Sequence, residues 1–349
     1  MLTYLILQNP GHNRVYYNLA DKLALAELQL ASLRMEVSST NIRIVDIAAV
    51  RYLAMDCDRE LSEADLQIIS RLSFVFALFQ LDESAGKQRL MPIAASAYQY
   101  VDDKISSLLK YQGKTNELFT KMMVNVALLS SNFKYDETIN LLDPVAGKGT
   151  TLFESSVYGF NSYGIEIEPK SVQEATLFFK KYIETERYKH KADKRMISGK
   201  SKADAIYIQE FEYARDKEEF KSESLRKKLA FVNGNTNDAA NYFKSNFFNL
   251  IVGDLPYGIA HGNTGVKKTG SITRNPSELL ELCLPGWNTV LKKGGCIVLA
   301  WNSFVVSKHR LTGHFNDNGF EVLSEAPYDQ FEHMVDKSIK RDIVVARKI

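Results

Sequence analysis

The chain has 349 residues, of which 45% are hydrophobic and 25% are charged, with a formal net charge of +2. This composition is typical of a globular protein and is sufficient for a large core together with a second, smaller domain. No apolar run is long enough to cross a bilayer and the N-terminus shows no basic-then-apolar signal pattern, which excludes a membrane-spanning class. A charge so near neutrality permits nucleic-acid binding without arguing for it, so any basic surface must be local.

The cysteine and histidine positions give no sign of a metal site. Cys57, Cys283 and Cys296 have neither metal-binding nor redox spacing, and the six histidines do not form metal-ligand pairs. We therefore expect no bound metal, free thiols and a cytoplasmic location.

Residues 1–95 predict a small α+β domain. Strands are expected at residues 4–8 and 42–47, a helix at 16–33, a second helix from Ser62, and an apolar run at 72–81. This block contains no catalytic pattern, so it is either a packing domain or a substrate-docking domain. Residues 96–135 then predict a helical linker, with helices at 98–111 and 121–130.

The first pattern that points to chemistry is Leu141-Leu-Asp-Pro-Val-Ala-Gly-Lys-Gly-Thr-Thr151. Its apolar start and the acid Asp143 are typical of a buried parallel strand that ends at the ligand-binding edge of a sheet. Gly147 and Gly149 permit a tight turn in which a ligand can approach the backbone. The helix expected over residues 150–158 begins there with free N–H groups.

Three nucleotide-type ligands use a turn of this kind. A phosphate loop requires Gly-x-x-x-x-Gly-Lys-Ser/Thr, but Leu142 takes the place of its first glycine and Gly149 follows Lys148. A dinucleotide fingerprint requires a third glycine where Leu152 stands, which weakens that alternative. The third ligand is S-adenosylmethionine, whose methionine carboxylate and ammonium groups would lie across the turn, with Asp143 near the ammonium.

An acid follows at the end of the second strand, which is expected at residues 162–167. A nucleoside ligand requires an acid here to accept hydrogen bonds from both ribose hydroxyls, and Glu166 is the first candidate, with Glu168 the second. Pro169 then begins a helix that extends to about residue 186. The alternative is a surface acid that the helix dipole favours.

The segment at residues 187–228 is highly charged and basic over its first half. It is longer than an ordinary connection between a helix and a strand. It forms either an inserted hairpin or helix that contacts phosphates or a solvated, partly mobile insertion, and we favour the solvated insertion. The third strand follows at 229–233, and Asn235 after it is typical of a turn. A helix is expected at 238–244.

The second pattern that points to chemistry is Leu250-Ile-Val-Gly-Asp-Leu-Pro-Tyr-Gly258. The part Asp254-Leu-Pro-Tyr-Gly258 resembles the (Asp/Asn)-x-Pro-(Tyr/Phe) motif of methyltransferases that modify exocyclic amino groups of bases. Such an amino group is a poor nucleophile because its lone pair is delocalised into the ring of the base. Asp254 can accept one amino hydrogen and a backbone carbonyl of Leu255 or Pro256 can accept another, which frees the lone pair. Pro256 stiffens the turn, and the ring of Tyr257 can stack on a base that has left its own stack.

The remaining segments complete an alternation of strands and helices. The glycine-rich and basic stretch 259–271 predicts a lid over the target base, with Lys267, Lys268 and Arg274 as candidates to hold a phosphate. A helix capped by Ser277 is expected to extend to residue 291, followed by a strand at 296–301, a helix to 318 and strands at 320–324 and 342–346. The pattern predicts a doubly wound, mostly parallel sheet of seven strands with a terminal antiparallel hairpin, at residues 136–349.

From about residue 112 to residue 349 the sequence resembles a class I, Rossmann-like, S-adenosylmethionine-dependent methyltransferase. Within that class it is most similar to the THUMP-associated RNA methyltransferases that make N2-methylguanosine in tRNA. The similarity rests on four segments: Asp143-Pro-x-x-Gly-x-Gly-Thr, Gly164-Ile-Glu-Ile-Glu, Asp254-Leu-Pro-Tyr-Gly and Asp336-Lys-Ser-Ile-Lys-Arg-Asp-Ile. The N-terminal block is short for the accessory regions of that group, Asn235 replaces a common Asp, and Leu255 replaces a second Pro.

The resemblance implies a set of site residues. Asp254, Pro256 and Tyr257 would be catalytic. The cofactor, S-adenosylmethionine, would be held by Asp143, Ala146, Gly147, Gly149, Thr150, Thr151, Glu166, Ile167, Asn235 and Thr236. Asn235 would contact its adenine. In such enzymes the segment before the first strand often closes over the cofactor, and Thr115, Asn116, Phe119 and Thr120 are candidates; the alternative is a plain helix cap with Phe119 in the core.

The expected function is methyl transfer to an exocyclic amino group of a nucleobase, with guanosine N2 in tRNA or other RNA as the first choice. Adenine N6 methylation of DNA or rRNA uses the same motif and stays open. A non-catalytic nucleic-acid-binding module on the same fold is the alternative from another class, and the retained Asp254, Pro256 and Tyr257 argue against it.

Overall fold

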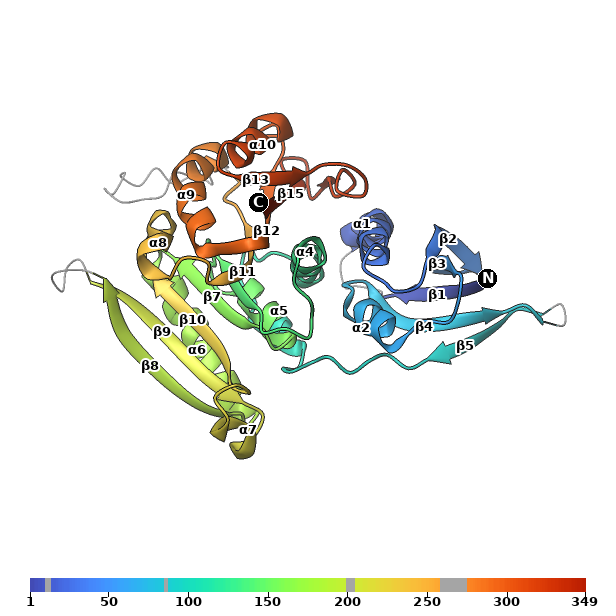
Figure 1. Ribbon diagram of the computed structural model, residues 1–349, viewed down its shortest axis with the longest axis horizontal. Helices are drawn as coiled ribbons and strands as arrows, with labels where there is room; N and C mark the ends of the chain where they lie inside the picture. Colours follow the sequence, from blue (N-terminus) through green and yellow to red (C-terminus); the bar gives the residue numbers. More distant parts are fainter. Residues whose placement is uncertain (10–13, 85–86, 199–204, 258–274) are drawn as a thin grey trace. The chain divides into compact units, whose positions relative to one another are not determined.

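The computed structural model describes residues 1–9, 14–84, 87–198, 205–257 and 275–349 (Figure 1). Its contacts divide the chain into two compact units. The first comprises Met1–Tyr98 and Ser324–Val335, and the second comprises Gln99–Leu323 and Asp336–Ile349. Among the described residues, no helix is both long enough and apolar enough to span a membrane.

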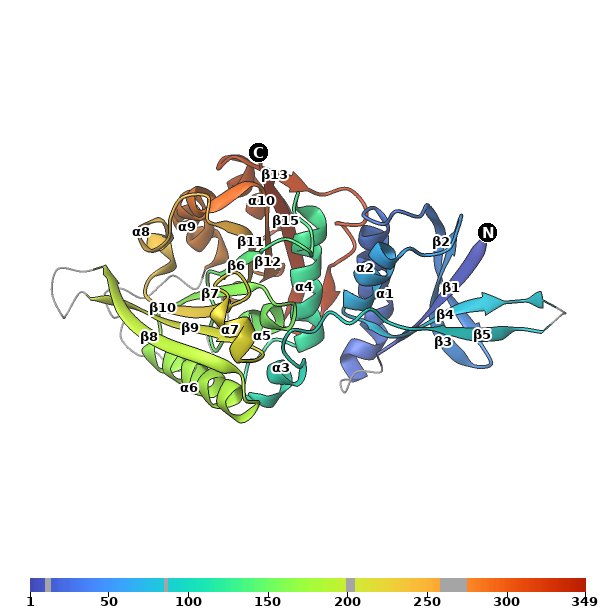
Figure 2. The ribbon, with the colours of Figure 1, turned by 60° about the horizontal axis from the view of Figure 1, so that its bottom comes forward.

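The first unit is built on an antiparallel sheet with the strand order β2-β3-β1-β4-β5. Its strands and helices are β1 (Leu2–Gln8), α1 (Arg14–Ser32), β2 (Ser39–Ile47), β3 (Val50–Cys57), α2 (Glu63–Arg71), β4 (Val75–Asp82) and β5 (Arg89–Ile93). The short β14 (His333–Met334) also falls among the residues of this unit but is not part of its sheet. Figure 2 shows the sheet with α1 and α2 beside it. Segment 324–335 joins this unit, although the sequence pattern does not separate it from the strands around it.

The start of α2 and the turn between β2 and β3 show what local sequence can and cannot predict. Ser62 caps α2 as predicted, in a capping box in which Asp65 completes the reciprocal hydrogen bonds. Strand β3 was not expected from the sequence, because its turn consists of Ala48 and Ala49, both at positive φ (49° and 62°). Asn-Gly is the usual signal for such a two-residue hairpin turn, and two alanines do not provide it.

The second unit is built on a mixed sheet with the order β13-β15-β12-β11-β6-β7-β10-β9-β8. The run β12-β11-β6-β7-β10 is parallel, whereas β15 and β13 at one edge and β9 and β8 at the other are antiparallel. The strands are β6 (Asn140–Asp143), β7 (Asn161–Glu166), β8 (Lys189–Ser198), β9 (Ile206–Ala214), β10 (Lys227–Asn233), β11 (Phe248–Asp254), β12 (Leu291–Asn302), β13 (Phe320–Leu323) and β15 (Lys340–Lys348).

Helices cover both faces of this sheet. They are α3 (Lys104–Leu108), α4 (Glu117–Ser130), α5 (Thr150–Val157), α6 (Pro169–Thr185), α7 (Lys217–Lys221), α8 (Ala239–Tyr242), α9 (Pro276–Val290) and α10 (Lys308–Asn316). Ala230 and Val232 of β10 pack in one core cluster with Trp287 of α9. Phe231, between them in the strand, lies beside Gly149 and Phe153 of α5. Since successive strand residues point to opposite faces, α5 and α9 lie on opposite sides of the sheet.

The prediction of an α/β unit is confirmed, and each of the seven predicted strands is present, but the sheet is not seven-stranded because β8 and β9 are added to it. The charged segment 187–228 forms β8, β9 and α7. The two strands pair as an antiparallel hairpin, which is the inserted hairpin of the first alternative rather than the favoured mobile insertion, and they extend the sheet at its edge. The exposed lysines of β8 leave no hydrophobic alternation for a pattern search to detect.

Two predicted helices also differ. The helix expected at 98–111 is reduced to α3, because the backbone N–H of Tyr100 donates to the carbonyl of Val157 (2.7 Å) and holds the preceding segment against the end of α5. Helix α9 is capped by Asn275 rather than Ser277: the Asn275 side chain accepts from the Ser277 N–H, and Pro276 occupies the first turn.

The strand order defines a switch point in the sheet. From β6 the chain moves outward through β7 to β10, then returns to β11 on the other side of β6 and continues to β12. Ligands of open α/β sheets bind outside the carboxyl ends of the strands at such a point. Asp143 ends β6 and Asp254 ends β11, so the two acids singled out in the sequence lie at this position.

Candidate functional site

A cavity of about 430 Å³ opens at the switch point. This volume lies within the range of roughly 300–1,000 Å³ that is usual for small-molecule sites. Its lining comes from the segment before α4, the turn after β6, the start of α6 and the turn after β11. The residues that carry the argument below and line it are Tyr111, Thr115, Thr120, Asp143, Ala146, Gly147, Lys148, Thr150, Thr151, Glu168, Asp254, Pro256 and Tyr257.

The turn after β6 is held by acids of two strands. Gly147 and Gly149 both adopt positive φ, at 52° and 89°, where glycine is favoured. The Gly147 N–H donates to Glu166 Oε2 (2.8 Å), and the N–H of Glu168 donates to Glu166 Oε1 (2.7 Å). The carboxylate of Glu166 therefore lies next to the glycine turn at the end of β7, where the sequence analysis predicted the acid that binds the ribose hydroxyls.

Asp143 is a buried acid whose charged neighbours are themselves acids. Its side chain is 3% exposed, and Oδ1 accepts the N–H of Val145 (3.0 Å). Burial raises the pKa of Asp143 to about 7, and the negative charges of Asp254 and Glu166 add to the rise. A positively charged group bound beside it would favour the ionised carboxylate.

Asp254 is the centre of a polar cluster on the other side of the cavity. Thr115 donates to its Oδ2 (2.6 Å), and the Tyr257 hydroxyl lies 2.7 Å from Oδ1 and 2.8 Å from Oδ2. Burial raises the pKa of Tyr257, and the charge of Asp254 raises it further, so the phenol stays protonated and donates. The sequence predicted the ring of Tyr257 as a stacking plate, but it did not predict this hydroxyl contact.

Arg341 of β15 completes the cluster and was not singled out in the sequence. Its Nε donates to the Tyr257 hydroxyl (2.7 Å), and its guanidinium lies over the rings of Phe119 and Tyr257. The resemblance included the segment 336–343, yet 84 residues separate Arg341 from Tyr257. Only the antiparallel pairing of β15 with β12 brings them together, and a local motif carries no signal for that pairing.

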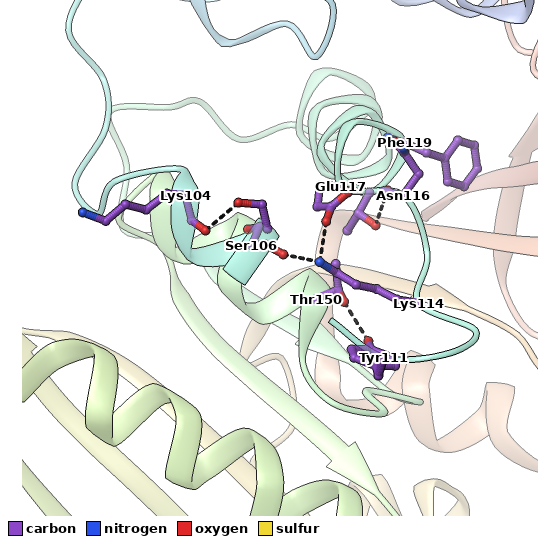
Figure 3. Close-up of polar contacts among 10 residues, drawn as sticks. Lys104, Ser106, Tyr111, Lys114, Asn116, Glu117, Phe119 and Thr150 are labelled. Atoms are coloured by element: carbon purple, nitrogen blue, oxygen red, sulfur yellow. Dashed lines mark hydrogen bonds and ion pairs between the residues drawn. The ribbon is translucent and has the colours of Figure 1, made fainter. Parts of the chain in front are cut away.

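The segment before α4 is tied down around the cavity. Figure 3 shows Lys114 reaching the carbonyl of Ser106 and the carboxylate of Glu117, and Tyr111 pointing to Thr150. The Tyr111 and Thr150 hydroxyls are 2.9 Å apart, and the Lys148 ammonium lies 4.9 Å from the centre of the Tyr111 ring. Tyr111 therefore covers the glycine turn, a contact that the sequence analysis assigned to residues 115–120.

Other residues of that segment divide between cavity and core. Thr115 and Thr120 line the cavity, whereas Asn116 caps α4 by accepting the N–H of Phe119 (3.1 Å). Phe119 is buried and packs under Arg341.

Several predicted cofactor residues do not line the cavity: Gly149 in the glycine turn, Glu166 at the end of β7, and Ile167, Asn235 and Thr236. Glu168, the second candidate for the ribose, does line it. Ile167 is 36% exposed beyond the end of β7. The Asn235 side chain accepts the N–H of Asn237 (3.0 Å) and caps one turn of 3₁₀ helix, Thr236–Asp238. Thr236 is buried and accepts a hydrogen bond from the Trp287 indole (3.0 Å). Their roles toward a cofactor stay predictions.

The predicted lid lies outside the residues that the structure describes. This applies to Gly258, the glycine-rich stretch after it, and Lys267, Lys268 and Arg274. In the ranges that are described, no three side chains among His, Cys, Asp and Glu are grouped in a way that could hold a metal ion.

Among known proteins, the chain is similar only in structure, to proteins whose structures have been solved. Neither a family model nor a curated protein sequence matches the chain. Similar solved structures include TrmN from Thermus thermophilus, which is 11% identical with a TM-score of 0.45 and with 100% of each chain covered.

Two others cover less of this chain. A TehB-like SAM-dependent methyltransferase from Corynebacterium glutamicum is 14% identical, with a TM-score of 0.32, 61% of this chain and 82% of that chain covered. An rRNA methylase from Streptococcus thermophilus is 9% identical, with a TM-score of 0.32, 61% of this chain and 89% of that chain covered. Because these identities and scores are low, we base the function on the residues of the site.

The two glycines of the turn should differ in their tolerance of a side chain. An ideal Cβ on Gly149 would lie 2.7 Å from Phe231 Cζ and 3.3 Å from Phe153 Cζ, whereas one on Gly147 meets nothing within 4 Å. We expect Gly147→Ala to lower the free energy of unfolding by about 1–2 kcal/mol, for the left-handed backbone alone. Gly149→Ala adds overpacking and should cost about 1–3 kcal/mol more. Urea unfolding of both variants measures this, and equal losses would contradict the predicted clash.

Proposed function

We propose that the chain is an S-adenosylmethionine-dependent methyltransferase that acts on an exocyclic amino group of a nucleobase, with guanosine N2 in tRNA or other RNA as its target. One observation carries this proposal. Asp254, followed by the rigid Pro256 turn and the aromatic Tyr257, lines the same cavity as the glycine turn and Asp143. An acceptor for an amino group and a site for a charged nucleoside-type ligand therefore share one space at the switch point of the sheet.

The residues around the glycine turn fit S-adenosylmethionine. Asp143 is buried beside the turn, where burial and the charges of Asp254 and Glu166 raise its pKa, and a bound ammonium such as that of the methionine part would offset this. Glu166 uses one hydrogen bond on each carboxylate oxygen for the backbone, and a carboxylate has about four acceptor sites in all, so it retains capacity for ribose hydroxyls. When bound, this cofactor would supply a methyl group activated by a sulfonium.

The chain's own residues would prepare the nucleophile. Asp254 accepts one hydrogen of the base amino group, and a carbonyl of Leu255 or Pro256 accepts the other, so that the nitrogen becomes tetrahedral and its lone pair points into the cavity. Asp254 then takes up the proton that the product nitrogen releases. Correct placement of the two reacting groups supplies most of the rate enhancement in such a displacement.

The strand at the edge of the sheet supports a polyanionic partner. Exposed basic side chains follow β8 at Lys189, Lys191, Lys194 and Arg195, with Asp193 as the only acid of the strand. Lysines on an edge strand also prevent sheet-to-sheet aggregation. A local basic stripe on a chain of net charge +2 nevertheless suits a phosphate backbone, since phosphate contacts dominate nucleic-acid affinity.

Incubation with labelled methyl donor and total tRNA, rRNA or DNA, followed by nucleoside analysis, tests the proposal. N2-methylguanosine in RNA is the expected product. N6-methyladenosine would establish the alternative target, and no labelled product from any substrate, with the cofactor bound, would favour a non-catalytic binding module.

Replacing Asp254 or Glu166 by alanine should affect catalysis and cofactor binding separately. Asp254→Ala should abolish turnover and leave the cofactor dissociation constant nearly unchanged, because Asp254 contacts the base. Glu166→Ala should raise that dissociation constant, by roughly tenfold or more for a lost charge-assisted hydrogen bond. Isothermal titration calorimetry and single-turnover assays measure both, and loss of cofactor binding in Asp254→Ala would contradict its assigned role.

Cofactor binding should depend on pH through Asp143. The pKa of this acid is raised to about 7 by burial in the free protein, and a bound ammonium favours the ionised form, so binding releases a proton. Affinity should therefore rise as pH rises, by roughly tenfold between about pH 5.5 and 7, below the range in which the ligand's own amino group titrates. Calorimetry checks this, with Asp143→Asn as the control, which should bind weakly and show little change over the same interval.

A further inference from the structure

Arg341 is a buried cation that contacts the candidate catalytic turn from a distant strand. It is 5% exposed on β15 and does not line the cavity. Its guanidinium carbon lies 4.7 Å from the centre of the Phe119 ring and 5.3 Å from that of Tyr257. These two rings belong to α4 and to the turn after β11, so one side chain joins three separate elements of the second unit.

The guanidinium reaches the carboxylate of Asp254 through Tyr257. Arg341 Nε donates to the Tyr257 hydroxyl at 2.7 Å, and that hydroxyl donates its single proton to Asp254, at 2.7 and 2.8 Å from the two oxygens. Arg341 Nη2 itself is 3.9 Å from Asp254 Oδ2, which is an ion-pair distance and too long for a hydrogen bond. The hydrogen bonds therefore all run in one direction: Arg341 donates to Tyr257, and Tyr257 donates to Asp254.

These hydrogen bonds fix the orientation of the Asp254 carboxylate without using all of its acceptor sites. A carboxylate offers about four acceptor sites on its two oxygens, and the shared Tyr257 proton and the Thr115 hydroxyl leave capacity for an amino hydrogen. The same contacts orient the Tyr257 ring at the cavity wall, where a base would stack.

We propose that Arg341 is a positioning residue for methyl transfer: it holds Tyr257 so that the hydroxyl fixes Asp254 and the ring faces the base. This inference rests on the proposed function. Lysine would not replace arginine here, because an ammonium is a point charge, whereas the planar fork directs Nε to the phenol while Nη2 faces the acid.

A double-mutant cycle tests the inference. Tyr257→Phe and Arg341→Gln should each lower kcat roughly 10- to 100-fold, the range expected for a lost hydrogen bond that serves a charged group. Because Arg341 acts through the Tyr257 hydroxyl, the kcat of the double variant should be within about threefold of the kcat of the slower single variant. Arg341→Lys keeps the charge and should be as slow as Arg341→Gln, while the cofactor dissociation constant stays near that of the wild type.

Arg347→Gln is the matched control. Arg347 lies on the same strand and pairs at the surface with Glu321 (2.7 Å), so its loss should leave kcat unchanged. Thermal unfolding of every variant shows whether it is folded. Multiplicative losses in the double variant, or full activity in Arg341→Lys, would overturn the positioning role.

Crystal structures of wild type and Arg341→Gln provide a readout that does not depend on activity. In the variant we expect the Tyr257 hydroxyl to lie more than about 3.5 Å from Asp254, beyond hydrogen-bond range. A hydroxyl that keeps its position would refute the inference even if the enzyme methylates RNA. A wild type that methylates no nucleic acid would refute the proposed function instead, and the two structures would still decide whether Arg341 positions Tyr257.

Discussion

The site depends on the parallel pairing of β6 with β11. Leu141 and Leu142 pair with Leu250 and Ile251, and this register brings the ends of the two strands, and therefore Asp143 and Asp254, to the same edge of the sheet. Two carboxylates at one edge of the sheet repel each other, and their surroundings in the structure differ. Asp143 is enclosed with a raised pKa, whereas Asp254 receives hydroxyl donors and a nearby guanidinium. Their chemical roles can differ for this reason.

Both acids could be predicted because each follows an apolar strand and precedes a turn of distinctive residues. Gly147, Gly149 and Pro256 are local signals, and local signals are what a single sequence carries best. The positions of the central strands along the chain follow from the same alternation of apolar runs and helix starts, whereas their order in the sheet was not predicted. What the sequence does not carry is pairing across long separations, so it predicted neither the contact of Arg341 with Tyr257 nor that of Tyr111 with Thr150.

Two errors have local causes. Strand β8 at the edge of the sheet is charged and exposed along most of its length, so the composition of the segment resembled that of a solvated insertion. The stretch before α3 has helix-compatible residues, but its backbone bonds to the end of α5 instead of to itself. In both cases tertiary contacts determined the conformation, and the sequence pattern was neutral or misleading.

The return of segment 324–335 to the first unit has a consequence for the covalent layout of the molecule. The polypeptide passes between the units at Tyr98–Gln99, at Leu323–Ser324 and again at Val335–Asp336, and Lys22 of α1 donates to the carbonyl of Glu332 (3.0 Å). A shortened polypeptide that starts at Gln99 would therefore retain a dozen residues that have lost their packing partners, immediately upstream of the strand that bears Arg341. The first unit therefore cannot be removed by truncating the N-terminus alone, because it contains two segments that are far apart in the sequence.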